Sequence, residues 1–346
     1  MKSVPHPRRR RGTLARLLAG VAGTAGAAGI AGAIAAAATW LPADRAAAAQ
    51  WPERPIRLLV GFAAGGGTDQ LARTFGDVLS RDLGQPVVID NRPGAGTTLA
   101  ATALARAPAD GHTLMLMSST NTIAPALYKS LPYDAVKDFR MVSMIASGPI
   151  VLAVPPESSI RTIADLAAQS RAKPGGVNYG AGGVATSMHL AALLLEQELG
   201  VPMTHVAYKG GAETTTALIG NQIDLMLVSP PTFAPVAARA RAIAVTSARR
   251  YAGLPEVPTL AESGVPGFDV VSWYALAAPR GLPAAIGERL AKAVSAAMSD
   301  PKLRQRFAEL GVEATPSTAD EASTILAAET ARWEGVLRKA GLSGTQ

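Results

Sequence analysis

Short apolar runs typical of buried β-strands alternate along this chain with longer runs whose apolar residues recur at helical spacing. Such alternation is typical of parallel sheets with helices on both faces, and it predicts an α/β protein. The β-type runs are, in chain order, IRLLVGF at 56–62, VVID at 87–90, TLMLMS at 113–118, MVSMIA at 141–146, IVLAVP at 150–155, VNYG at 177–180, a short run at 204–206, IDLMLV at 223–228, AIAVTS at 242–247 and VVSWYALAAP at 270–279. Helices are expected near 71–83, 97–106, 162–171, 186–199, between 206 and 223, and near 283–299, 301–310 and 318–340.

The alternation forms two series, which predicts two lobes instead of one. The 297 residues that follow the first 49 also exceed what a single hydrophobic core usually holds. The expected boundaries are 50–152 with 274–346 for the first lobe and 153–273 for the second lobe. No linker rich in Gly, Ser or Pro separates the two series, so we expect strands near 150–155 and 270–279 to join the lobes and act as a hinge.

The N-terminal segment has the organisation of an export signal. The basic stretch RRRRG at 8–12 precedes an apolar run from Leu14 to Leu41, and the small residues from Ala46 to Ala49 offer a cleavage site. We expect cleavage after Ala49 and a periplasmic mature protein. The length of the apolar run leaves an uncleaved membrane anchor open, and the sequence does not distinguish the general export route from the twin-arginine route.

The charge and the cysteine content exclude several functional classes. The chain carries a formal net charge of +7, but its first 49 residues hold seven Lys and Arg against one acidic residue, which leaves +1 for the rest. A nearly neutral body lacks the clustered cations that nucleic-acid binding needs, so no nucleic-acid partner is expected. Because the chain has no Cys, disulfides, thiolate metal sites, a cysteine nucleophile and a lipid anchor on cysteine are excluded.

Turns rich in glycine or hydroxyl residues follow several of the predicted strands. The first is AAGGGTD at 63–69, where backbone N–H groups beside the positive end of a helix dipole would form an anion site. It lacks the dinucleotide fingerprint, because Gln70 stands where Gly is required, and it lacks the Lys of a P-loop. Similar turns occur at NRPGAGTT (91–98), SSTN (118–121) and YGAGG (179–183), and ligands of open α/β sheets sit beyond strand ends. Together these turns favour a site for a carboxylate that is held and then released.

A longer series of motifs extends in order over residues 50–342. The motifs are FAAGGGTDQLAR, NRPGAG, DGHTL, YGAGGVATSMHL, VAYKGG, GNQIDLMLVS, VPTLAESGVPGF, SWYALAAP and ETARWEGVLRKAGL. This series resembles the solute-binding receptors of the tripartite tricarboxylate transporters, the Bug-type extracytoplasmic receptors. The resemblance implies a two-lobed type II periplasmic binding protein fold, in which each lobe is a mostly parallel sheet flanked by helices and the ligand cleft lies between the lobes. It also implies a monomer without a cofactor that captures a small carboxylate by hinge closure and delivers it to membrane permease subunits.

The resemblance further implies which residues bind the ligand, partly through ordered waters. These residues are Ala64, Gly65, Gly66, Asp69, Ser118, Ser119, Asn121, Gly180, Ala181, Gly183, Thr186, His189 and Asp224. Ala181 departs from the family pattern, because many relatives have a hydroxyl residue at this position. Three of the residues have structural alternatives: Asp69 as a helix cap, His189 as a neutral histidine bonded to backbone, and Asp224 as the partner of a backbone group.

The residue pattern gives no positive support for catalysis. His112, His189 and His205 lack the i, i+4 spacing of a helical zinc site and no G-x-S-x-G motif is present, so neither catalytic nor metal-binding residues are assigned. Catalytic groups need only be close in space, so a periplasmic carboxylic-acid hydrolase or lyase on the same fold stays open as an alternative. A ligand-binding partner of a membrane sensor kinase is a third alternative, because it would use the same binding chemistry.

Overall fold

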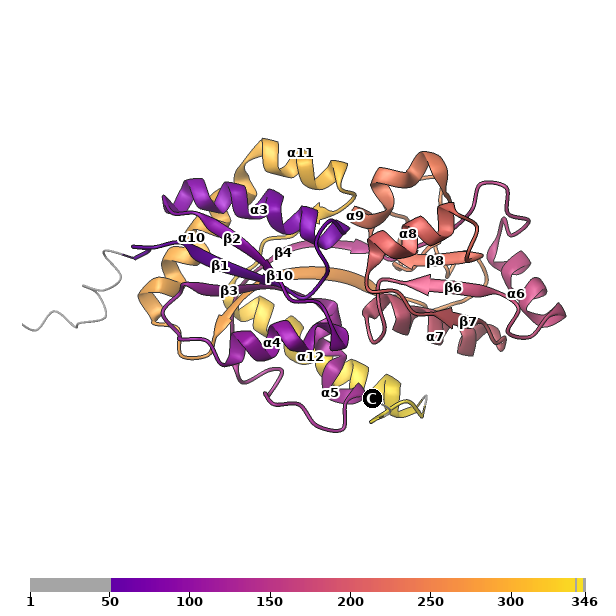
Figure 1. The fold of residues 1–346 in the computed structure, drawn as a ribbon, viewed down its shortest axis with the longest axis horizontal. Helices are drawn as coiled ribbons and strands as arrows, with labels where there is room; N and C mark the ends of the chain where they lie inside the picture. The colour runs from indigo at the N-terminus through magenta and orange to yellow at the C-terminus, as the bar shows by residue number, and fades with distance from the viewer. Residues whose placement is uncertain (1–50, 340, 345–346) are drawn as a thin grey trace, which may run out of the picture. The chain divides into compact units, whose positions relative to one another are not determined.

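The computed structural model describes residues 51–339 and 341–344, which fall within one compact unit, Ala47–Gln346. The predicted export signal and its cleavage site lie outside the described residues. The described residues form two sheets, each flanked by helices (Figure 1). No helix in this part of the chain is long and apolar enough to cross a membrane.

One sheet has six strands, and we call the part of the chain built on it the first lobe. Its strand order is β11-β4-β10-β3-β1-β2. The strands are β1 (Ile56–Val60), β2 (Val87–Asn91), β3 (Thr113–Ser118), β4 (Phe139–Pro149), β10 (Val271–Pro279) and β11 (Glu313–Ala314). β1 pairs in parallel with β2 and β3, whereas β10 runs antiparallel to both β3 and β4.

The other sheet has five strands, and we call the part of the chain built on it the second lobe. Its order is β7-β6-β8-β5-β9. The strands are β5 (Val151–Val154), β6 (Asn178–Ala181), β7 (Thr204–Val206), β8 (Leu225–Val228) and β9 (Arg241–Val245). β6 is parallel to β7 and β8, and β5 is antiparallel to β8 and β9.

The two-lobed α/β fold is confirmed, but the sheets are mixed, not mostly parallel. The reason is the path of the chain between the sheets. A single residue, Ile150, separates β4 in the first sheet from β5 in the second, and β10 returns to the first sheet. The parallel strands β1, β3, β6 and β8 all end at the cleft between the lobes. A strand that begins at the cleft must therefore run antiparallel to them, as β5 and β10 do.

The helices agree with the sequence pattern wherever they are long enough to show a periodicity. They are α3 (Gly67–Leu83), α4 (Thr98–Ala105), α6 (Ile163–Ala172), α7 (Ser187–Leu199), α8 (Gly211–Ile219), α10 (Ala284–Ser299), α11 (Pro301–Glu309) and α12 (Ala319–Lys339). Short helical segments were not predicted, because one turn carries no periodic signal. These are α5 (Ala124–Leu127), α9 (Pro230–Phe233) and the 3₁₀ turns η1 (Ala95–Thr97), η2 (Ser119–Thr122) and η3 (Ala234–Arg239).

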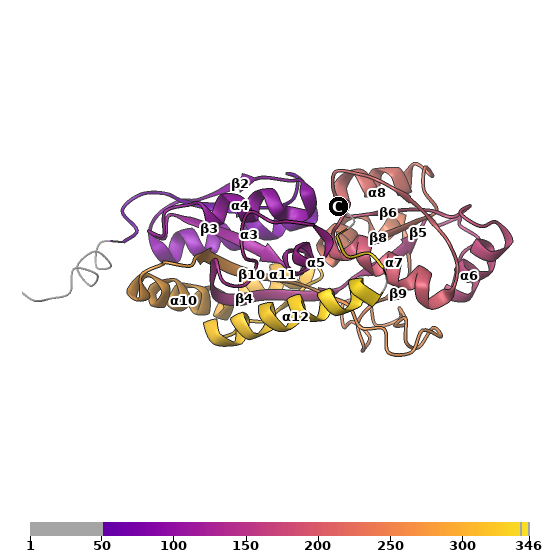
Figure 2. The ribbon, with the colours of Figure 1, turned by 90° about the horizontal axis from the view of Figure 1, so that it is seen from below.

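The last long helix packs against both lobes. Ala322 and Leu326, in the first half of α12, belong to a hydrophobic cluster of first-lobe residues. Trp333 and Leu337, further along, belong to a cluster that includes the strands and α7 of the second lobe. Figure 2 shows α12 running along β4 toward the second lobe. The helix therefore spans the same junction as the crossing strands.

Leu58 offers a test of the strand order in the first sheet. Its side chain is fully buried in β1, paired with Ile89 of β2 and Leu114 of β3. We expect Leu58→Ala to lower the free energy of unfolding by about 2–5 kcal/mol in urea denaturation, because it removes buried methyl groups and leaves a cavity. The control Val88→Thr changes an exposed residue on the edge strand β2 and should cost less than about 0.5 kcal/mol. Equal losses for the two variants would contradict an interior position for β1.

Candidate ligand-binding cleft

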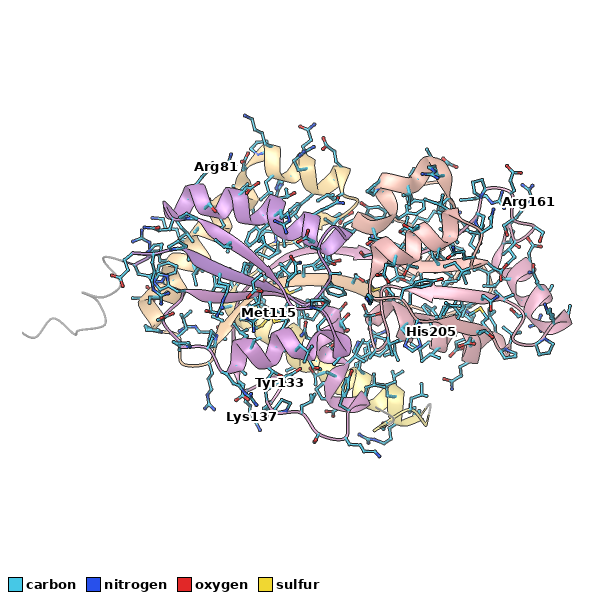
Figure 3. The ribbon with its side chains drawn as sticks, in the orientation of Figure 1. Arg81, Met115, Tyr133, Lys137, Arg161 and His205 are labelled. Carbon is cyan, nitrogen blue, oxygen red and sulfur yellow. The ribbon has the colours of Figure 1, made fainter. Side chains whose placement is uncertain are left out.

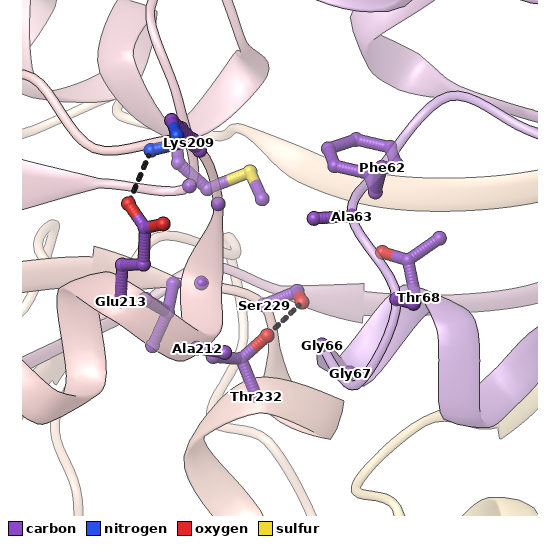
Figure 4. A pocket seen from close by; sticks show the side chains of 16 residues that line it. Phe62, Ala63, Gly66, Gly67, Thr68, Lys209, Ala212, Glu213, Ser229 and Thr232 are labelled. Carbon is purple, nitrogen blue, oxygen red and sulfur yellow. Dashed lines mark hydrogen bonds between the residues drawn. The ribbon is translucent and has the colours of Figure 1, made fainter. Parts of the chain in front are cut away.

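Loops at the ends of strands from both lobes enclose a small cavity of about 110 Å³. The first lobe contributes the turn that follows β1, and the second lobe contributes the start of α8 and the residues that follow β6 and β8. The lining residues are Phe62, Ala63, Ala64, Gly66, Gly67, Thr68, Gly182, Met188, Lys209, Gly210, Gly211, Ala212, Glu213, Val228, Ser229 and Thr232. Figure 4 shows Phe62, Ala63 and Thr68 facing Lys209, Ala212 and Glu213 across this cavity. We call it the inner chamber.

Two helices begin at the inner chamber without a side-chain cap. The N-cap residues are Gly66 for α3 and Gly210 for α8, and neither helix has a side-chain hydrogen bond at its cap. The first N–H groups of a helix have no partner within the helix, and the helix dipole places partial positive charge there. Both starts therefore offer backbone donors to an anion in the chamber.

An acidic residue shapes each of these helix starts in the same way. In the first lobe, the N–H of Gly65 donates to Asp69 Oδ2 at 2.9 Å. In the second lobe, the N–H of Lys209 donates to Glu213 Oε2 at 3.0 Å. Each carboxylate lies three residues after its N-cap glycine and binds the residue before that glycine. The acids thus fix the two turns, and residues of both first helical turns line the chamber.

Asp69 is occupied by protein groups. Besides Gly65, it accepts hydrogen bonds from Arg73 Nε at 2.9 Å and from Asn91 Nδ2 at 3.0 Å, and it is 2% exposed. Burial acts to raise the pKa of Asp69, but the hydrogen bonds from Arg73, Gly65 and Asn91 outweigh it and lower the pKa below its usual value. Asp69 is therefore an ionised support for the turn, next to Ala64 and Gly66, which line the chamber.

A wider space of about 550 Å³ adjoins the inner chamber and shares Phe62, Gly182 and Lys209 with it. We call it the outer chamber. Its other lining residues are Gly61, Pro93, Gly94, Ala95, Gly96, Thr97, Tyr128, Gly183, Val184, Thr186 and Tyr208. Thr97 adopts a left-handed conformation (φ 71°), and within the described part of the chain its buried Oγ1 has no hydrogen-bond partner. The NRPGAG loop thus forms one wall of the cleft, as its sequence suggested.

The hydroxyl-rich turn after β3 joins the lobes beside the two chambers. Asn121 Oδ1 accepts the N–H of Ser118 at 3.0 Å, which closes the turn. Ser119 Oγ donates to Ser187 Oγ, in the first turn of α7, at 3.3 Å. Ser118, Ser119 and Asn121 are buried at this junction and are absent from the lining of both chambers. The buried Asn121 Nδ2 has no partner among the described residues.

The predicted residues of the YGAGG turn divide into two groups. Gly183 and Thr186 line the outer chamber, and Thr186 Oγ1 donates to the Gly183 carbonyl at 2.7 Å. Gly180 and Ala181 lie inside the second lobe: a Cβ on Gly180 would come within 2.7 Å of Thr214 Cγ2, and the Ala181 carbonyl accepts from Thr214 Oγ1 at 2.8 Å. Both residues are buried in β6, directly before the turn, so they support its position without lining either chamber.

His189 and Asp224 also bond to backbone. His189 Nδ1 accepts the N–H of Ala185 at 3.3 Å, and its ring stacks on His205 with centroids 4.0 Å apart. His205 is labelled in the second lobe in Figure 3. Asp224 Oδ2 accepts the N–H of Asn178 at 2.8 Å, at the beginning of β6 and β8. The chambers lie at the other end of these strands, so Asp224 is not brought together with the remaining residues.

Several lining residues were missing from the predicted set. They include Phe62, Thr68, Tyr128, Tyr208, Lys209, Gly210, Gly211, Glu213, Ser229 and Thr232. A signal for some of them was present: Gly210-Gly211 repeats the glycine turn of the first lobe, and Ser229 directly follows β8. Thr232 lies on the unpredicted helix α9, for which the sequence had no periodic signal.

The lobes touch on both sides of the cleft. A Cβ on Gly67 would collide with the backbone N of Thr232, and a Cβ on Gly96 would lie 2.8 Å from the carbonyl oxygen of Ala185. Only glycine permits approaches this close. The two lobes are therefore packed against each other around the chambers.

The pKa of His189 gives a testable pH dependence. Burial, with a smaller contribution from His205, lowers the pKa of His189 from its usual 6.5 to about 4. The unfolded chain therefore binds more protons than the folded protein between these values, and stability decreases as the pH falls through this window. We expect wild type to lose on the order of 2 kcal/mol more than His189→Gln between pH 7 and pH 4.5, measured by urea unfolding. Identical losses would contradict a neutral, buried His189.

Comparisons with known proteins identify the family of this chain. The model of the tripartite tricarboxylate transporter family receptors, TctC, matches residues 71–342. Among curated proteins, BugT of Bordetella pertussis is 34% identical over 295 residues, which is 84% of this chain and 90% of BugT. The UPF0065 protein encoded in the tcbD-tcbE intergenic region of Pseudomonas sp. strain P51 is 35% identical over 299 residues, covering 86% of this chain and 89% of that protein.

Solved structures show the same fold. The periplasmic binding protein BugD has a TM-score of 0.81 at 32% identity over 85% of this chain and 99% of its own. Rpa4515 of R. palustris, solved with adipate, has a TM-score of 0.81 at 35% identity with the same two coverages. MatC of Rhodopseudomonas palustris, solved with malate, has a TM-score of 0.79 at 32% identity over 83% of this chain and 100% of its own. With a family match over most of the chain and a fold that places two uncapped helix starts at one cleft, this chain belongs to the tripartite tricarboxylate transporter receptor family.

Proposed function

We propose that this protein captures a small carboxylate in the cleft by closure of the two lobes and delivers it to the membrane permease subunits of a tripartite transporter. In this proposal the mature protein is a periplasmic monomer, produced by cleavage after Ala49, and it releases its ligand unchanged. The lobes would comprise 50–152 with 274–346 and 153–273, joined at the two strand crossings. The observation that carries the proposal is the pair of uncapped helix starts at the inner chamber.

The paired helix starts suit a carboxylate for an electrostatic reason. Each N-terminus is equivalent to roughly half a positive charge, so α3 and α8 together match one carboxylate. Their donors are neutral backbone groups, which hold an anion without an opposed formal charge. Family membership and the solved relatives with adipate and with malate support the same class of ligand.

Closure follows from the way the lobes are joined. Ile150 and Val270 adjoin the two crossings, where small backbone rotations would move one lobe against the other. A ligand that bonds to both α3 and α8 has higher affinity for the closed arrangement, and this difference shifts the equilibrium toward it. The contacts of Gly67 with Thr232 and of Gly96 with Ala185 mark the closed state.

A thermal-unfolding screen tests the ligand class. Mono-, di- and tricarboxylates would be compared with phosphate esters and nucleotides. A ligand at about 1,000 times its Kd stabilises by roughly 4 kcal/mol, so the matching carboxylate should raise Tm by several degrees. Unchanged concentration of that compound after long incubation would support a receptor. Shifts with phosphate compounds but with no carboxylate would contradict the proposal, and consumption of the compound would favour the hydrolase or lyase.

Gly67→Val tests closure. The new side chain would collide with the backbone of Thr232 in the opposite lobe, so the closed state is expected to be disfavoured while each lobe folds normally. We expect at least a tenfold loss of affinity for the carboxylate found in the screen, and loss of the ligand-induced decrease in the radius of gyration in small-angle X-ray scattering. The matched control Gly335→Ala adds a Cβ on α12 where no atom lies within 4 Å, and it should retain wild-type affinity. Wild-type affinity in Gly67→Val would refute the closure model.

A further inference from the structure

The charges that line the cleft limit the number of negative groups on the ligand. Among the described residues that line the two chambers, the side chains with a full charge at neutral pH are Lys209 and Glu213. Their formal charges are opposite, so the net formal charge of the side chains that line the chambers is zero. The remaining positive potential comes from the starts of α3 and α8, which together balance about one negative charge. A second or third carboxylate on the ligand would have no matching cation.

The outer chamber has the lining of an apolar site. Three aromatic rings border it: Phe62 and Tyr128 from the first lobe and Tyr208 from the second lobe. Pro93 and Val184 add aliphatic surface, and much of the remaining wall is glycine. The Tyr128 side chain is partly buried, and this burial raises the pKa of its hydroxyl. Rings from both lobes can therefore enclose a flat apolar group on two sides when the lobes close.

The two chambers adjoin, so a single ligand can place its acid in the inner chamber and an apolar group in the outer chamber. Phe62, Gly182 and Lys209 border both spaces, so the chambers adjoin at these residues. The inner chamber is small, about 110 Å³, and presents the backbone donors, whereas the outer chamber is about 550 Å³. Ligand sites are commonly apolar with a few polar groups that fix orientation, as here.

We propose that the ligand is a monocarboxylate with an aromatic ring, whose carboxylate binds the paired starts of α3 and α8 and whose ring lies among Phe62, Tyr128 and Tyr208. This inference rests on the proposed carboxylate receptor function and specifies its ligand. The proposed ligand differs from the ligands of the two solved relatives, because adipate and malate are dicarboxylates without a ring. Because Phe62 borders both chambers, a short chain between the acid and the ring would lie beside this residue.

Isothermal titration of the purified protein tests the ligand class. The probes are 3-phenylpropanoate, its saturated analogue 3-cyclohexylpropanoate, adipate, malate and citrate. We expect 3-phenylpropanoate to bind at least about tenfold more tightly than adipate, malate or citrate, and about threefold more tightly than the cyclohexyl analogue, because ring stacking adds to apolar burial. Tighter binding of adipate, malate or citrate would overturn the inference and leave the carboxylate receptor intact. Binding of none of the five acids would overturn the inference as well, and the wider carboxylate screen would then decide the proposed function separately.

Variants of the aromatic wall locate the ring. Tyr128→Leu and Tyr208→Leu should each weaken 3-phenylpropanoate about tenfold, whereas Tyr208→Phe, which keeps the ring, should stay within about threefold of wild type. Tyr133→Phe is the control, since Tyr133 packs on Phe139 in the first lobe and lies outside both linings; Figure 3 labels it near Lys137. Thermal unfolding without ligand confirms that each variant is folded. Unchanged affinity in both leucine variants would refute the assigned position of the ring.

Discussion

The path of the chain between the two sheets determines most of the structure. β4 continues into β5 across one residue, and β10 returns, so two extended segments connect the lobes. Because the parallel strands of both sheets end at the cleft, the turns that follow them meet there from opposite sides. The same geometry forces the incoming strands to run antiparallel, which produces the mixed sheets. A cleft with strand-end turns on both walls is thus a consequence of connectivity.

The two lobes present the same helix-start arrangement to the cleft. In each lobe a glycine caps the start of a helix without a side-chain bond, and an acid in the first turn bonds the residue before that glycine. Asp69 and Glu213 are therefore compatible with an anion site, because they hold the turns instead of the ligand. The donors that remain are backbone N–H groups of two different lobes. An anion that bonds to both of them links its own binding to closure of the cleft.

The sequence predicted β1 to β10 from short apolar runs and the long helices from apolar residues at helical spacing, whereas the two-residue strand β11 is too short to give such a signal and was not predicted. The family resemblance also implied Gly66, Gly183 and Thr186 as ligand-binding residues, and these residues of the glycine-rich turns line the cleft. For His189 and Asp224 the sequence left a ligand contact and a bond to backbone both open. In the structure His189 accepts the N–H of Ala185, four residues before it, and Asp224 accepts the N–H of Asn178 on the neighbouring strand, a partner 46 residues away that no local pattern identifies. The same limit explains the missed residue Thr232: it lies on a one-turn helix and reaches the cleft through the packing of α9 against α3.

The central claim is that the carboxylate of the ligand binds the starts of α3 and α8 together. A crystal structure of the complex with the carboxylate that stabilises the protein most would test this claim directly. The account predicts carboxylate oxygens bonded, directly or through one ordered water, to backbone N–H groups in the first turns of both helices. It also predicts that Asp69 keeps its bonds to Gly65, Arg73 and Asn91 in the complex. A carboxylate held by one lobe alone, or by Lys209 away from both helix starts, would contradict it.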